Sequence, residues 1–125
     1  MIRIFLSVSA GGAIGSLLRY GTGVWLSKYF HNAFPYATLA VNVVGCFLIG
    51  VFYSLSEHYR WFSPNLRLFL ITGFCGGLTT FSAFAYENIK LLQEGNTLLF
   101  IVYSVGSFAL ALLAVIAGIN FIKLL

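Results

Sequence analysis

Four long apolar stretches, separated by short polar connections, make up this chain of 125 residues. A helix needs about 20 mostly apolar residues to cross the roughly 30 Å of hydrocarbon in a bilayer. Four such helices and their loops use nearly the whole chain. Charged residues form only 8% of the sequence, far below the roughly 25% of a soluble domain. We therefore predict an all-α integral membrane protein, a single domain over residues 1–125 with four transmembrane helices.

The predicted spans cover residues 4–26, 36–55, 68–86 and 98–122, joined by short loops that make neighbouring helices antiparallel. The balance of Lys and Arg between the two sides normally sets the orientation in the membrane. One side carries Arg3, Arg60, Arg67 and Lys123, and the other carries Lys28 and Lys90. This small difference predicts that copies insert both ways and pair as an antiparallel, dual-topology dimer. The cations form no patch, so no nucleic-acid partner is expected.

Polar side chains inside the spans are candidate functional groups, because in hydrocarbon they need a partner or a wet cavity. Arg19 in the first span either extends to the membrane surface or attracts anions at a pore mouth. Asn42 in the second span either joins two helices or donates its amide hydrogens to an anion. On the fourth span, Tyr103 and Ser107 are four residues apart, with Ser104 between them, and form a hydroxyl stripe.

The third span contains two glycines followed by two threonines near its middle, which is a poor helix interior. We predict a break in this helix from Gly76 to Thr80. A break at this depth exposes backbone groups that protein, water or an ion must satisfy. Phe81 and Phe84 follow three residues apart and share a helix face. Such a pair usually packs against neighbours or lipid, but its positive ring edges can also face an anion.

Acidic residues are rare: Glu57, Glu87 and Glu94 are the only ones, and all three are predicted at or beyond the span ends. His31 and His58 fall in loops. A proton-driven transporter normally needs a titratable group inside the membrane, and most hydrolases need a base. The sequence therefore favours passive conduction and predicts no enzymatic activity.

These features resemble the CrcB, or Fluc, family of fluoride channels. The resemblance runs along nearly the whole chain, through residues 11–15 with Arg19, residues 38–42 with Gly45, and residues 73–84. It implies a dual-topology dimer in the cell membrane, with two parallel pores lined by both subunits, through which fluoride leaves the cytoplasm passively. The partner would be a second copy of the chain or a paralogous subunit.

The resemblance also implies roles for individual residues. By motif position, Phe81 and Phe84 would contact fluoride with their ring edges, Asn42 would donate to it, and Tyr103 and Ser107 would belong to a hydroxyl track.

A structural sodium ion at the dimer centre is implied as well, held by the backbone carbonyls of Gly76 and Thr79. Ala83 departs from the family pattern, since members commonly have threonine between the two phenylalanines.

Two other classes of protein stay open. A small multidrug exporter also has four helices and often dual topology, but a glutamate is expected deep in its first span, where this chain has Arg19. A non-conducting membrane assembly protein would use Asn42 and the hydroxyls only to join helices.

Overall fold

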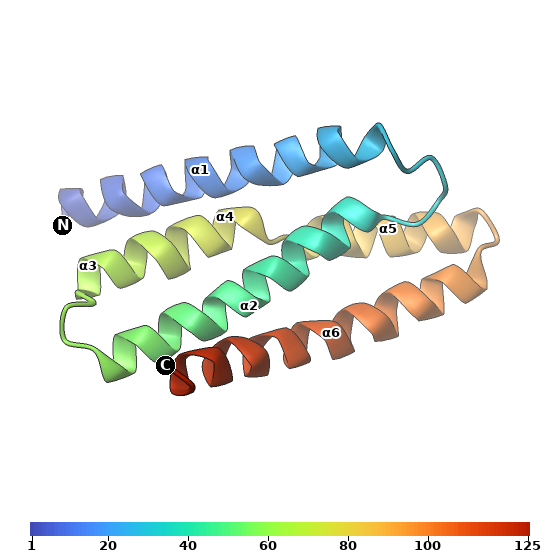
Figure 1. The fold of residues 1–125 in the computed structure, drawn as a ribbon. Coiled ribbons are helices and arrows are strands. Elements are labelled where there is room, and N and C mark those ends of the chain that lie inside the picture. The colour runs from blue at the N-terminus through green and yellow to red at the C-terminus, as the bar shows by residue number, and fades with distance from the viewer.

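All 125 residues are described by the computed structural model, and every regular element is helical (Figure 1). The elements are α1 (Ile2–Ser27), α2 (Tyr36–His58), α3 (Pro64–Arg67), the π-helix η1 (Leu68–Cys75), α4 (Gly76–Leu78), α5 (Phe81–Gln93) and α6 (Thr97–Lys123). The elements from α3 to α5 follow one another as a single bent span, so four spans cross the molecule. Both termini and the α2–α3 connection lie at one end, and the other two connections lie at the opposite end (Figure 1).

The exterior of this bundle is apolar. All four spans are long and apolar enough to cross a membrane, and only 18 of the 125 residues are buried within the chain. Large side chains such as Leu17, Phe108 and Leu113 point outward. An apolar surface of this extent suits lipid or another protein surface, which confirms the prediction of an all-α, multi-pass membrane protein.

Glycines allow close contact between two pairs of helices. On α1, a Cβ at Gly11 or Gly15 would collide with the backbone of η1 at Phe69 or Phe74. A Cβ at Gly77 would meet the backbone of Gly12 on the other side of the same contact. The contact between α2 and α6 is built in the same way, by Gly50 and Gly118. Small residues bring helix backbones together where lipid provides no hydrophobic drive between helices.

The break in the third span is narrower than predicted. Gly76 and Gly77 belong to α4, and only Thr79 and Thr80 are extended, with φ/ψ of −88°/156° and −150°/124°. The prediction of a break from Gly76 to Thr80 was therefore wrong in its first residues. Gly77 is present because a Cβ there would meet the backbone of Gly12, so the glycines serve the contact with α1 and not the break. The β-branched threonines adopt extended backbone readily.

The third span also extends beyond its predicted range of residues 68–86, because it runs from Pro64 to Gln93. Its last turns bury Asn88 and Leu91, and this packing continues the helix past the point where the sequence turns polar. Glu87 consequently lies inside α5 and not in a connection, so its predicted place at or beyond a span end was wrong. The other predicted spans correspond closely to α1, α2 and α6.

Candidate functional site: a groove beside the helix break

The break ends with a local cap. The Thr80 hydroxyl accepts a hydrogen bond from the Ala83 N–H at 3.2 Å, which makes Thr80 the N-cap of α5. Threonine is a favoured residue at this position because its side chain pairs an otherwise free backbone N–H. The cap fixes where α5 begins, and so it fixes the direction of the phenylalanines in the first turn.

Asn42 on α2 pairs with both backbone groups of Thr80. Its Nδ2–H donates to the Thr80 carbonyl at 3.1 Å, and its Oδ1 accepts from the Thr80 N–H at 2.8 Å. The amide thus replaces the helical partners that Thr80 lost at the break. An amide carries two N–H donors, so one remains for another acceptor in the groove beside it. Asn42 therefore joins two helices, as expected for a non-conducting assembly protein. Its second amide N–H is still free to donate to another group.

Arg19 supports the break from α1. Its Nε–H donates to the Gly77 carbonyl at 3.0 Å, at the carboxyl end of α4, where a positive charge is favourable. The side chain is half-buried and is bonded to Gly77 beside the helix break, which does not fit an anchor that extends to the membrane surface. It does not line the groove that contains Asn42.

The groove beside the break has a volume of about 300 Å³. Ten residues line it: Asn42, Cys46, Ile49, Thr79, Thr80, Phe81, Phe84, Ser107, Phe108 and Ala111. Phe81 is 79% exposed, and its ring centroid lies 5.8 Å from that of Phe84 at an interplanar angle of 40°. The structure thus brings together four of the five residues predicted for the anion path, with Tyr103 adjacent.

Ser107 adds an unsatisfied donor to this groove. Its hydroxyl oxygen is buried and has no hydrogen-bond partner within the chain. Buried polar atoms are nearly always paired, so an exception calls for an explanation such as a ligand. Together, the groove offers aromatic ring edges, one amide N–H and one free hydroxyl, and no charged side chain lines it.

Tyr103 belongs to a separate polar cluster next to the groove. Only 1% of Tyr103 is exposed; its hydroxyl donates to Glu87 Oε1 at 2.9 Å, and the Thr38 hydroxyl donates to Glu87 Oε2 at 2.8 Å. The Tyr103 ring lies 5.0 Å from that of Phe84, which links the cluster to the groove. One helical turn separates Tyr103 from Ser107 on α6, so the predicted stripe connects the two regions.

Ser104 is not part of this stripe. Its hydroxyl donates to Asn88 Oδ1 at 2.8 Å, while Asn88 Nδ2–H donates back to the Phe84 carbonyl at 3.0 Å. Ser104 therefore joins α6 to α5, a structural role that the spacing alone did not distinguish from the path.

Glu87 is the residue of this polar cluster whose position the sequence analysis predicted wrongly. Because this carboxylate lies in a span and accepts two hydroxyl donors, the supposed absence of acids in the membrane no longer argues against proton coupling. A signal was present: Glu87 lies three residues after Phe84, and a helix continued through it brings both side chains to one face.

Comparison with known proteins gives a consistent result. The family described as "CrcB-like protein, Camphor Resistance (CrcB)" matches residues 6–119. A relative from Rhizobium leguminosarum bv. trifolii, named fluoride-specific ion channel FluC, is 51% identical over 100% of this chain and 99% of its own length. Relatives of the same name from Flavobacterium psychrophilum and Chloroflexus aurantiacus are 47% and 46% identical, covering 98% and 92% of this chain and 98% and 91% of their own lengths.

The pairing of Asn42 with Thr80 can be tested by stability. Asn42→Leu removes both hydrogen bonds and leaves backbone groups unpaired, which costs about 1–3 kcal/mol. We expect the purified variant to unfold in detergent at a clearly lower temperature than the wild type. Asn120 on α6 is exposed and makes no side-chain hydrogen bond, so Asn120→Leu should unfold like the wild type. Equal melting of both variants would show that the amide does not hold the break.

Proposed function

Since this chain belongs to the CrcB family of membrane proteins, we propose that it is a passive fluoride channel. Hydrogen fluoride is a weak acid that crosses membranes in its neutral form and dissociates inside, so the anion accumulates in the cytoplasm. A channel of this kind releases fluoride down its electrochemical gradient and lowers its toxicity. No organic cofactor and no energy source is required, and the protein is not an enzyme.

The groove beside the helix break is the observation that carries this proposal. Fluoride is small and strongly hydrated, so a pore must replace its water with donors. Phe81 and Phe84 supply positive ring edges, Asn42 supplies its second amide N–H, and Ser107 supplies an unpaired hydroxyl. All of these donors are neutral. Neutral donors bind an anion well enough to admit it and weakly enough to release it.

Tyr103 continues the donor path beyond Phe84. Its hydroxyl and that of Thr38 both donate to Glu87, so each could turn to an anion that passes. We assign the hydroxyl track to Ser107 in the groove and Tyr103 beyond it. Arg19, paired with the Gly77 carbonyl, lends positive charge to the break.

We further propose that the channel is an antiparallel dimer. Within one chain the groove is open, and Phe81 is 79% exposed in it. A second copy inserted in the opposite orientation would close the groove of each chain and give two parallel pores. The small Lys and Arg difference between the two ends supports insertion both ways. A paralogous subunit could close the groove in the same manner.

We propose that the backbone carbonyls of Gly76 and Thr79 hold a sodium ion at the centre of the dimer. The Thr80 N–H, which would close the helical turn on the Gly76 carbonyl, donates to Asn42 instead, and Thr79 lies in the extended break. No side chain donates to either carbonyl, and a Cβ at Gly76 would meet nothing closer than 3.9 Å within the chain. Two carbonyls from each of two copies give four oxygen ligands, which suits a hard cation. Bound sodium would join the two chains.

Fluoride efflux from liposomes that contain only this purified protein tests the proposed channel. We expect rapid fluoride release when valinomycin carries the compensating potassium, no chloride release, and no loss of fluoride release when a protonophore collapses the pH gradient. The protonophore arm matters because Glu87 lies within a span. Release that requires a proton gradient would favour an exporter, and no release from dimer-sized protein would favour a paralogous partner or an assembly protein.

The phenylalanine pair separates a pore from an assembly protein. Phe81→Leu and Phe84→Leu remove the ring edges, and a loss of about 1 kcal/mol of anion contact corresponds to a roughly fivefold lower flux. The dimer should remain intact. Phe5→Leu is the matched control, since Phe5 is exposed on α1 away from the groove. Loss of the dimer in these variants, or a wild-type flux through intact dimers, would show that the rings only join helices.

Sodium binding has its own readout in the dimer. Because a ligand that binds only the assembled state stabilises it, replacing sodium by N-methylglucamine should lower the dimer fraction of dilute protein in detergent. Thr79→Ser keeps the backbone carbonyl and should respond to sodium like the wild type. A dimer fraction that is the same in both solutions would contradict the assigned sodium site.

A further inference from the structure

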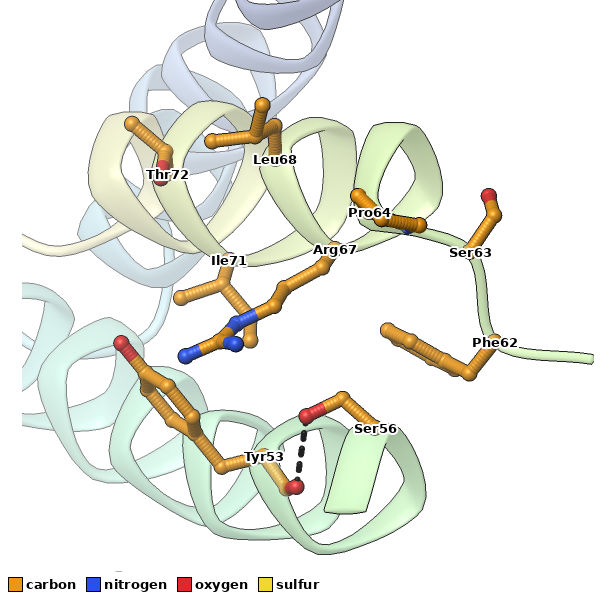
Figure 2. A pocket seen from close by; sticks show the side chains of 9 residues that line it. All are labelled: Tyr53, Ser56, Phe62, Ser63, Pro64, Arg67, Leu68, Ile71 and Thr72. Carbon is orange, nitrogen blue, oxygen red and sulfur yellow. Dashed lines mark hydrogen bonds between the residues drawn. The ribbon is translucent and has the colours of Figure 1, made fainter. Parts of the chain in front are cut away.

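A hollow separate from the groove lies at the end of the molecule that contains both termini and the α2–α3 connection. It measures about 450 Å³ and lies between the end of α2 and the start of the third span (Figure 2). The residues that line it are Tyr53, Ser56, Phe62, Ser63, Pro64, Arg67, Leu68, Ile71 and Thr72. The guanidinium of Arg67 extends across the hollow and lies over the Tyr53 ring, 4.9 Å from its centroid.

The lining of this hollow suits an anion. No carboxylate is among the lining residues, so the charge of Arg67 is not neutralised there. The Ser63 hydroxyl accepts from the Leu66 N–H at 3.1 Å, which leaves its own hydrogen free to donate. Stacking on Tyr53 holds the guanidinium in place while its N–H donors stay available. The Ser56 hydroxyl donates to the Tyr53 carbonyl at 2.8 Å, so the hollow combines the charge of Arg67 with the free hydroxyl hydrogen of Ser63.

One face of α2 connects this hollow to the groove beside the helix break. Cys46 and Ile49 line the groove, while Tyr53 and Ser56 line the hollow. These four residues follow one another at spacings of three and four, which places them on a single stripe of the helix. The stripe therefore marks the line along which an ion from the hollow would reach Asn42 if a second chain covered this face of α2.

We propose that the Arg67 hollow is the mouth in which fluoride gathers before it enters the groove. This inference rests on the proposed channel function and assigns the pore-mouth attraction, first expected of Arg19, to Arg67. Arg19 is engaged with the Gly77 carbonyl and lines neither opening. Arg67 is exposed in a space large enough for water, so its charge would raise the local anion concentration without trapping the ion in a dry site.

The test compares the initial rate of fluoride efflux for three variants at about 0.1 M and about 1 M of an inert salt, between which the screening length falls from about 10 Å to about 3 Å. Arg67→Gln should reduce the rate severalfold at low salt, and the difference from wild type should shrink at high salt. Arg67→Lys keeps the charge and should conduct like wild type. Arg60→Gln removes a charge from the same connection but outside the hollow, and should have little effect.

A second pair of variants keeps Arg67 in place. Ser63 caps α3, and both aspartate and asparagine are good caps, so Ser63→Asp and Ser63→Asn should both fold. Aspartate puts a negative charge into the hollow and should slow efflux at low salt, whereas asparagine should not. This pair reports on the charge of the hollow even if Arg67→Gln fails to assemble.

Several results would overturn the assignment to Arg67 alone: efflux by Arg67→Gln or Ser63→Asp at the wild-type rate, an equal loss in Arg60→Gln, or a loss that salt does not reduce. An effect seen only in liposomes that contain anionic lipid would assign the hollow to a lipid phosphate. A wild-type protein that releases no fluoride would instead refute the proposed channel, together with the mouth that depends on it.

Discussion

The pairing of the Asn42 amide with the backbone of Thr80 is the interaction on which the site depends. A helix interrupted inside a membrane leaves N–H and carbonyl groups with no water to satisfy them. Asn42 satisfies both groups of Thr80 with one side chain. Thr80 can then cap α5, which directs Phe81 and Phe84 into the groove. The same pairing frees the Gly76 carbonyl from its helical role.

The break is held from two sides, because α1 packs along η1 and α4 through glycines. The backbones approach so closely at Gly15 and Gly77 that no side chain fits between them. This contact places Arg19 within reach of the Gly77 carbonyl. The Gly77 carbonyl in α4 and the backbone of Thr80 in the break thus receive polar partners from different helices. In the proposed dimer, this support leaves the carbonyls of Gly76 and Thr79 available to a shared cation.

Local patterns predicted the parts of the structure that depend on neighbouring residues. The length of the apolar stretches predicted the four spans, and the run of glycines and threonines predicted a break. The three-residue spacing of Phe81 and Phe84 predicted that they share one helix face. The features that the sequence did not predict depend on tertiary contacts. The polar end of α5 remains helical because Asn88 and Leu91 pack inward, and Glu87 finds its donors on two other helices. The hollow around Arg67 exists only because α2 and η1 lie side by side.

The positions of the charges indicate how such a path can be both attractive and fast. No charged side chain lines the groove. Arg67 lies in the separate hollow that we propose as its mouth, and Glu87 is hydrogen-bonded to Tyr103 beyond Phe84. A full positive charge in the narrow part would hold an anion strongly, because few waters would screen the attraction. The same charge in a wide, hydrated mouth increases the supply of ions without binding them tightly. If Arg67 attracts anions at the mouth and only neutral donors contact them in the groove, the weak binding by these donors sets the rate of conduction.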